Sequence, residues 1–423
     1  MLRRKRRRKP KLLQWCTLSV LWMAVVILMA IGLAIQTMSI MDKKRITLER
    51  LDQSRILPMT LRDVGIPMPQ KVCQPKTHVM FLKTHKTASS TILNILYRFG
   101  EARNLTFALP NSYQFGYPFL FSTRKIKFYS PIKMQEYHII CNHMRFFRPQ
   151  VEKVMAKGTF YFSILRSPVT LAESSFTYYK GTSTAFRQVQ SLEQFLREPW
   201  KYYSAKDRGN QYARNLMWFD FGFDSNANDT KDYVDVVLKE ISSTFHLILL
   251  SEYFDESMIL LKDALCWDFD DVVSFKLNLR SNVTVKKLSL EMVGQVKAWN
   301  SLDWKLYLHF NRTFWQKVEQ YGQQRMKNDV LILQQKRKKL MDLCLQGSSP
   351  VEASQIQDKN IKPFQYGQAR ILGYNLNPNL NNRTREKCMR MVMPELQYKD
   401  LLDSKLFPLT PAVKNLRLPQ RRF

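Results

Sequence analysis

The alternation of apolar runs with amphipathic stretches predicts a parallel sheet covered by helices. Short apolar runs typical of buried strands occur at 78–82, 137–144, 159–165 and 245–250. Stretches with helical character lie between or after them, at 89–100, 167–179 and 255–265. Strands that alternate with helices are typical of α/β proteins, in which helices flank both faces of the sheet.

The first predicted helix carries a single apolar stripe, formed by Ile92, Ile95, Leu96 and Phe99. We expect Ser89 or Ser90 to cap its start and Gly100 to end it. Another helical stretch, 313–344, is long enough to need a break, which we expect near Gly322.

A different pattern opens the chain, because residues 12–35 are apolar and carry no charge. A segment of this length can cross a bilayer as a helix. A cleavable signal peptide is the alternative, but its apolar core would be shorter and would end at a small-residue cleavage site. Lysine and arginine crowd residues 1–11 far more than the flank after the segment, which places the N-terminus in the cytosol.

The predicted organisation is therefore a cytoplasmic basic tail (1–11), a transmembrane signal-anchor (12–35), a stem (36–72) and a luminal domain (73–423). Five N-x-[ST] sequons agree with a luminal address, at Asn104, Asn228, Asn282, Asn311 and Asn382. This layout is that of a single-pass type II membrane protein with a luminal domain.

Five cysteines follow the predicted anchor: Cys73, Cys141, Cys266, Cys344 and Cys388. None belongs to a C-x-x-C pair, so we expect no zinc site. In an oxidising lumen we expect two disulfides. The odd cysteine either stays free or pairs between chains, which would give a homodimer.

The net charge of +31 favours polyanionic partners: nucleic acid, anionic lipid, or small molecules that carry phosphate or sulfate. A solvated basic surface accounts equally for many of the lysines. The basic tail requires only anionic lipid at the cytosolic face, so we expect no nucleic-acid partner.

Candidate chemistry begins in the turn "KTHKTASST", residues 83–91, between the first strand and the first helix. Such a turn can bind phosphate through the free N–H groups of the helix, and small residues let the anion approach. Lys86 adds a positive charge. The turn lacks the glycines of the Walker A pattern, and the stretch after strand 245–250 offers only Glu252 and Asp255 as magnesium ligands. The plain alternative is a capped helix with surface lysines.

A second candidate lies at the end of strand 159–165, where Arg166 stands at the edge at which α/β sheets bind ligands. Ser167 and Pro168 are typical of a helix start. Ser174 follows eight residues after Arg166, so a guanidinium and a hydroxyl can hold a second phosphate together.

Two histidines are candidates for a general base. His143 lies at the end of strand 137–144, from which an imidazole can take a proton from a sugar hydroxyl. His85 lies inside the phosphate turn, between Lys83 and Lys86. Either histidine can instead be structural or help to hold phosphate.

The two phosphate sites together resemble those of sulfotransferases that use 3′-phosphoadenylyl sulfate (PAPS). The resemblance implies a P-loop-like sulfotransferase fold with no metal, in which Lys86 acts on the 5′-phosphosulfate. The neighbouring ligands it implies are Lys83, Thr87, Ala88, Ser89, Ser90 and Thr91, while Arg166 and Ser174 bind the 3′-phosphate.

More specific strings resemble the galactose 3-O-sulfotransferase family from about residue 75 to 400, among them "FLKTHKTASST", "IICNHMRF", "FYFSILR", "WFDFGFD" and "VMPELQY". This resemblance implies an enzyme of the Golgi membrane that transfers sulfate to the 3-hydroxyl of terminal β-galactose on glycoprotein or glycolipid glycans. It also implies His143 as the preferred base, with His85 as its rival. Galactosylceramide is the alternative acceptor. Competing hypotheses are a membrane-anchored kinase and a galactoside-binding protein without activity.

Overall fold

The computed structural model describes residues 73–133 and 135–408, which belong to a compact unit that begins at Cys73. Its central sheet contains β1 (Val79–Leu82), β2 (Phe107–Ala108), β3 (Ile139–Ile140), β4 (Phe160–Leu165) and β5 (Leu247–Leu250). The strands lie in the order β2-β3-β1-β4-β5, and each of these pairings is parallel. The predicted parallel sheet is confirmed. The two-residue strand β2 was not predicted, since so short a run carries no readable periodicity.

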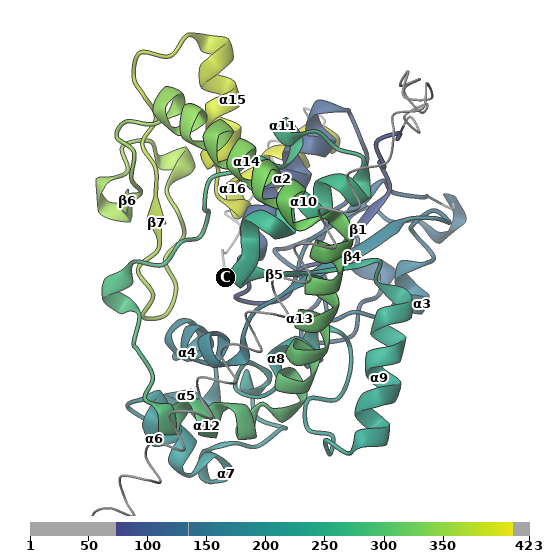
Figure 1. Cartoon of the computed structure of the whole chain (residues 1–423), viewed down its shortest axis with the longest axis vertical. Coiled ribbons are helices and arrows are strands. Elements are labelled where there is room, and N and C mark those ends of the chain that lie inside the picture. Colours follow the sequence, from purple (N-terminus) through teal and green to yellow (C-terminus); the bar gives the residue numbers. More distant parts are fainter. Residues whose placement is uncertain (1–72, 134, 409–423) are drawn as a thin grey trace, which may run out of the picture. The chain divides into compact units, whose positions relative to one another are not determined.

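The helices are α2 (Ser89–Ala102), α3 (Arg148–Val151), α4 (Pro168–Tyr179), α5 (Thr184–Arg187), α6 (Leu192–Arg197), α7 (Pro199–Tyr202), α8 (Leu216–Asp220), α9 (Lys231–Thr244), α10 (Phe254–Leu265), α11 (Phe269–Val272), α12 (Leu290–Trp299), α13 (Ser301–Tyr321), α14 (Gln323–Cys344), α15 (Asn382–Val392) and α16 (Glu395–Leu406). In Figure 1, α2 and α10 lie above the sheet, and α8 and α9 lie below it. All four residues of β1 are fully buried, as expected of a strand covered on both faces.

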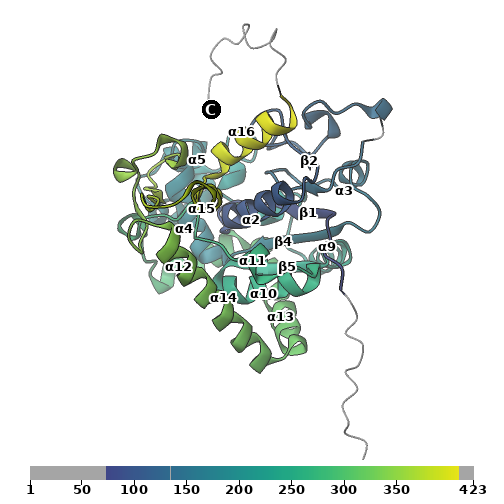
Figure 2. The ribbon, with the colours of Figure 1, turned by 90° about the horizontal axis from the view of Figure 1, so that it is seen from above.

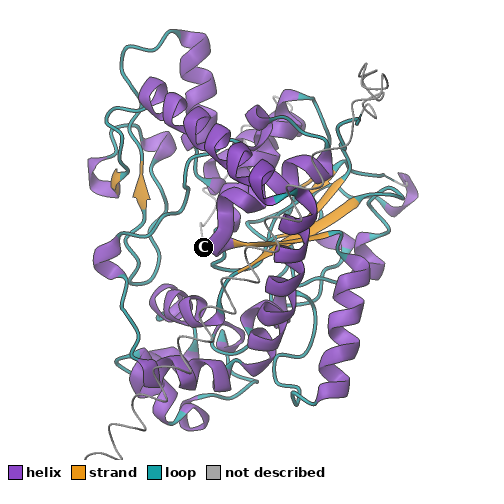
Figure 3. Ribbon diagram, viewed as in Figure 1, coloured by secondary structure: helices purple, strands orange, loops and turns teal. Residues whose placement is uncertain are grey.

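A small antiparallel pair, β6 (Val351–Glu352) with β7 (Leu372–Gly373), lies apart from the central sheet. Figure 3 shows these short strands among loops, away from the main group of strands. They belong to the segment that follows α14.

The long helix predicted at 313–344 is broken at Gly322, as expected. Gly322 has a φ of 98°, a backbone conformation that glycine adopts without steric cost, and it separates α13 from α14. The first of the two helices begins earlier than predicted, at Ser301.

Two details predicted for α2 are wrong. Ala88 occupies the N-cap position, and neither serine caps the helix, because the Ser89 and Ser90 hydroxyls donate to Thr84 O and to Glu395 instead. Gly100 lies inside the helix, which ends at Ala102. A Cβ atom at Gly100 would lie 2.3 Å from the ring of Phe107, so glycine there permits the close approach of β2.

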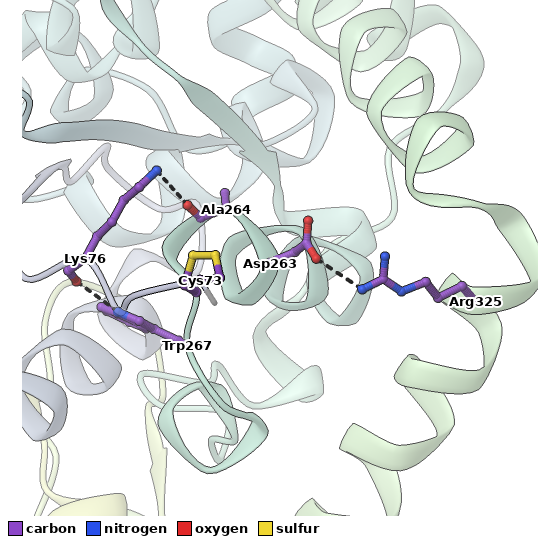
Figure 4. The surroundings of a disulfide bond; sticks show 7 residues. Cys73, Lys76, Asp263, Ala264, Trp267 and Arg325 are labelled. Atoms are coloured by element: carbon purple, nitrogen blue, oxygen red, sulfur yellow. Dashed lines mark hydrogen bonds and ion pairs between the residues drawn. A yellow bond between two sulfur atoms is a disulfide. The ribbon is translucent and has the colours of Figure 1, made fainter. Parts of the chain in front are cut away.

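Two disulfides are present, as predicted: Cys73–Cys266 and Cys344–Cys388. The first ties the start of the compact unit to the end of α10 (Figure 4), where Lys76 also donates to Ala264 O at 2.9 Å. Cys141 is free and fully buried in the sheet. The structure therefore gives no support to the homodimer expected through an odd cysteine, since this thiol is not accessible to another chain.

The predicted anchor (12–35) and stem (36–72) lie outside the described residues, and the predicted domain boundaries stay predictions. Across residues 73–133 and 135–408, no helix combines the length and the apolar character that a membrane crossing requires.

Candidate functional site

The turn between β1 and α2 is held in an uncommon backbone conformation. Lys86 and Ala88 have positive φ values of 59° and 64°, which are rare for residues other than glycine. Thr84 anchors the turn by donating a hydrogen bond to Ile164 O on β4 at 2.5 Å. Such conformations persist only when the surroundings enforce them, and they concentrate at functional sites. The first N–H groups of α2 receive no side-chain cap.

The two phosphate sites predicted from sequence meet in space. The guanidinium of Arg166 donates from Nη1 to the carbonyl oxygen of Lys86 at 2.9 Å and from Nε to Thr170 Oγ1 at 2.9 Å. Ser174 is buried in α4 and faces the same cavity. The cavity has a volume of about 2250 Å³ and is lined by the turn, α4, and segments near 274–285, 359–366 and 392–408.

Positive charge accumulates around Lys86, whose ammonium lies 3.6 Å from the ring centre of Tyr178. Burial, together with the charges of Arg166, Lys83 and Arg280, lowers the pKa of Lys86 to about 7. A site in which cations repel one another is suited to an anionic ligand, which would relieve the repulsion.

Arg280 is a further cation at this cavity, and sequence reasoning missed it. Its Nη2 atom pairs with Glu173 Oε2 on α4, whereas Nη1 is buried and has no hydrogen-bond partner among the described residues. A buried guanidinium N–H without an acceptor is costly and points to a ligand that accepts from it.

His85 forms a dyad with Asp220, the last residue of α8. Asp220 accepts from the backbone N–H of His85 at 2.8 Å and from its Nδ1 at 2.9 Å. Because a carboxylate can only accept, Nδ1 carries the hydrogen and Nε2 keeps its lone pair. No described residue bonds that Nε2, and His85 lines the cavity. A carboxylate that orients an imidazole in this way is the usual arrangement of a general base.

His143 is engaged on both ring nitrogens. Its Nδ1 donates to the carbonyl oxygen of Lys83 at 2.9 Å, and its Nε2 accepts from the Lys83 ammonium at 2.7 Å. Burial, together with the charges of His85 and Lys83, lowers the pKa of His143 well below its usual range. His143 is therefore neutral, and its only lone pair is occupied.

The remaining predicted ligands line the same cavity: Lys83, Thr87, Ala88, Ser89, Ser90 and Thr91. Several already have protein partners. Lys83 pairs with Glu395 at 3.2 Å, Ser90 donates to the same carboxylate at 2.6 Å, and Thr91 Oγ1 accepts from Leu277 N at 3.1 Å. Ala88 is exposed at the edge of the turn.

The two carboxylates that sequence offered as magnesium ligands also have partners. Glu252 accepts from the backbone N–H of Ser167 at 2.7 Å, and Asp255 pairs with Arg337. Within the described part of the chain, no group of three or more His, Cys, Asp or Glu residues is arranged to hold a metal ion.

Asp220 and Glu395 are functional candidates that sequence reasoning did not select. Both lie in strings that carried the family resemblance, "WFDFGFD" and "VMPELQY". Membership in these strings was the only sequence feature that could have pointed to the two carboxylates, since neither belongs to a motif of fixed spacing.

The sequons differ in exposure. Asn104, Asn228, Asn282 and Asn382 are exposed. Asn311 lies inside α13 with a buried Oδ1, which makes it the least accessible to a glycosylating enzyme.

Comparison with known proteins identifies a family and several relatives. The family model described as galactose-3-O-sulfotransferase matches residues 5–406. A mouse protein named galactose-3-O-sulfotransferase 2 is 50% identical over 353 residues, which cover 82% of this chain and 90% of the relative. The human protein of the same name is 48% identical over 347 residues, with coverages of 81% and 86%. Bovine galactosylceramide sulfotransferase is 43% identical over 332 residues, with coverages of 77% and 78%.

Family match and relatives extend over most of the chain, including the turn, Arg166 and the histidines, so this sulfotransferase belongs to the galactose-3-O-sulfotransferase family.

Proposed function

We propose that the protein transfers sulfate from PAPS to the 3-hydroxyl of a terminal β-galactose. The observation that carries this proposal is the convergence of Lys86, Arg166 and Arg280 on one cavity, with Arg166 bonded to the carbonyl oxygen of Lys86. PAPS carries anionic groups at both ends of its nucleoside, so it needs cations at two points. The buried Nη1 of Arg280, which lacks an acceptor among the described residues, fits such a ligand.

Each end of the donor has its own set of ligands in this proposal. Lys86 and the uncapped N–H groups at the start of α2 bind the 5′-phosphosulfate. Arg166 and Ser174 bind the 3′-phosphate, for which a guanidinium offers paired donors. Of the other turn residues, Thr87, Ala88 and Ser89 lie nearest this start of the helix and form the wall beside it.

The acceptor hydroxyl needs a base, and the hydrogen bonds favour His85 over His143. Nε2 of His85 is unbonded within the described residues and is oriented by Asp220, whereas Nε2 of His143 accepts from Lys83. The preference drawn from the family resemblance for His143 is therefore replaced by His85 as base. His143 supports it, because the two rings stack 4.0 Å apart.

The chemical step is a displacement at sulfur. His85 Nε2 takes the proton of the galactose 3-hydroxyl, whose oxygen forms the new bond to sulfur while the bond from sulfur to the bridging phosphate oxygen breaks. Lys86 stabilises the charge that develops on that bridging oxygen, and adenosine 3′,5′-bisphosphate leaves. Positioning and fixed charge account for most of the acceleration in this type of transfer.

The proposed acceptors are galactose-terminated glycans of glycoproteins, and galactosylceramide is the alternative. The named galactose-3-O-sulfotransferase 2 relatives have the higher identity, at 48 to 50%, against 42 to 43% for the galactosylceramide sulfotransferases. We further propose the Golgi membrane as the location, as the family resemblance implies. The charge bias around residues 12–35 supports a luminal position for the described residues.

A transfer assay tests this proposal. The full-length protein is incubated with [³⁵S]PAPS and a panel of type 1, type 2 and core 1 galactosides and galactosylceramide. We expect label on O3 of galactose in at least one glycoside. A protein that binds galactosides but transfers no label is a lectin, and one that instead needs ATP and magnesium is a kinase; either result overturns the proposal.

A further inference from the structure

Glu395 reaches the donor turn from the far end of the chain. It is the first residue of α16, which packs beside α2 (Figure 2), and it lies 305 residues from Ser90 in the sequence. Its carboxylate accepts from Ser90 Oγ at 2.6 Å and from the Tyr113 hydroxyl, and it pairs with Lys83 Nζ at 3.2 Å. The side chain is 11% exposed.

This carboxylate is ionised despite its burial. Burial raises the pKa of Glu395, but the charge of Lys83 and the hydrogen bonds from Ser90 and Tyr113 outweigh that effect and hold the pKa below its usual value. Burying a carboxylate is costly unless the group is paired and hydrogen-bonded, and the three donors supply that compensation.

Lys83 depends on this partner. Its side chain is 3% exposed, and burial lowers its pKa, while the carboxylate of Glu395 acts in the opposite direction. The other titratable groups around Lys83 are Asp220 on α8, Cys141 after β3, Lys86 in the same turn, and His143, which accepts from the ammonium. Glu395 is the carboxylate in direct contact.

We propose that Glu395 is a positioning residue for sulfate transfer: it keeps Lys83 as an ammonium ion seated against Nε2 of His143, and so fixes the ring on which His85 stacks. The chain of contacts runs from Glu395 to Lys83 at 3.2 Å, from Lys83 to His143 at 2.7 Å, and from His143 to His85 at 4.0 Å between ring centres. This inference rests on the proposed function, because it assigns a role in the step that His85 performs.

The same contacts revise the role of two turn residues. Lys83 and Ser90 were expected to bind the donor, but both already bind Glu395. In this account they organise the turn, and Lys86 is the lysine that meets the donor. Within the described residues, Lys86 forms no ion pair with a carboxylate, which leaves its charge available.

The test is the pH profile of kcat for the full-length Glu395→Gln protein. The amide keeps the shape of the side chain and removes its charge, so Lys83 loses its proton at lower pH. The pH above which kcat falls should therefore be lower than in the unchanged protein by about one to three units. A shift of this size is usual for the loss of an opposite charge at contact distance. In Glu395→Asp, which keeps the charge, kcat should fall at the same alkaline pH as in the unchanged protein.

A matched control is Glu386→Gln on α15. Glu386 is also a carboxylate paired with a cation, Arg390 at 3.3 Å, but its side chain is 69% exposed and does not line the cavity. This variant should keep both kcat and the pH profile. A purely structural role for Glu395 predicts a lower unfolding temperature with an unshifted profile, and that result would overturn the inference.

A double-mutant cycle covers the case in which Glu395→Gln alone does not fold. Lys83→Gln combined with Glu395→Gln removes both buried charges, so no unpaired charge remains. If Glu395 acts through Lys83, the double variant has the kcat of Lys83→Gln alone. A kcat of the double variant well below that of Lys83→Gln contradicts the proposal. Absence of sulfate transfer by the unchanged protein would refute the proposed function instead, so the two failures are distinct.

Discussion

The imidazole rings of His85 and His143 stack with their centres 4.0 Å apart and their planes 11° from parallel. Their ring nitrogens nevertheless bond to side chains of opposite charge. His85 donates to the carboxylate of Asp220, and His143 accepts from the ammonium of Lys83. One ring is thus prepared to accept a proton, while the other has no free lone pair. This asymmetry assigns different roles to two residues that look equivalent in the sequence.

The first prediction concerns the base. His85→Gln should lower kcat by about 10² to 10⁴-fold, the usual contribution of general base catalysis, while binding of adenosine 3′,5′-bisphosphate persists. Asp220→Asn should have a similar effect, because an amide N–H facing Nδ1 reverses the tautomer and places the hydrogen on Nε2. The measurements are steady-state kinetics and calorimetric titration. A His85→Gln protein with unchanged kcat would return the role to His143.

The second prediction is a pH dependence of donor-product binding. Lys86 has a pKa of about 7 in the free protein, and a bound anion favours its ammonium form. Below pH 7 the proton is already present; above pH 7 binding must take one up, so Kd should rise by up to about tenfold per pH unit. Titration with adenosine 3′,5′-bisphosphate between pH 7 and 9 measures this slope.

Lys86→Arg provides the control for that slope, since a guanidinium stays charged across this range. The Kd of this variant should be higher than that of the unchanged protein at pH 7, but it should change little with pH. If the arginine variant shows the same slope as lysine, another group is responsible for it.

The third prediction concerns recognition of the 3′-phosphate. Arg166→Ala should reduce the preference for adenosine 3′,5′-bisphosphate over adenosine 5′-phosphate by about 10- to 100-fold, the size expected for losing a hydrogen bond to a charged group. The matched control is Arg197→Ala, since Arg197 lies on the surface of α6 and pairs only with Glu193. If Arg166→Ala weakens the binding of both nucleotides equally, Arg166 contacts a part of the nucleotide other than the 3′-phosphate.

The fourth prediction concerns the packing of α2 on the sheet. Gly100→Ala would bring Cβ to 2.3 Å from the Phe107 ring, and such overpacking typically costs about 1–3 kcal/mol of unfolding free energy. Gly294→Ala, inside α12 with no atom within 4 Å of the added Cβ, should instead be neutral or slightly stabilising. Denaturant unfolding of the two variants measures the difference, and equal stabilities would contradict the packing argument.

Local patterns predicted the frame of the site well. The apolar run of β1, the helix α4 that starts at Pro168, and the placement of Arg166 at a strand end all follow from spacing and residue type, and the parallel sheet brings strand ends together. The meeting of Arg166 with Lys86 is a consequence of β1 and β4 being neighbours. Sequence could therefore place both candidate phosphate sites at the same edge of the sheet without contact information.

The residues that sequence did not select are those that act through tertiary contact. Asp220 and Glu395 reach the turn from distant segments, 135 and 305 residues away from His85 and Ser90. Neither has a periodic or spaced signature. Gly100 was read as a helix end because glycine is common there, but the nearby Phe107 ring explains it better, and that ring is placed by the sheet.

The most direct test of the central claim, that one anionic donor is held by Lys86 and Arg166 together, is titration of the full-length protein with adenosine 3′,5′-bisphosphate. The account predicts saturable binding at one site, weakened at least about tenfold in Lys86→Ala and in Arg166→Ala, while both variants keep the unfolding temperature of the unchanged protein. No binding by the unchanged protein, or undiminished binding by both variants, would contradict it.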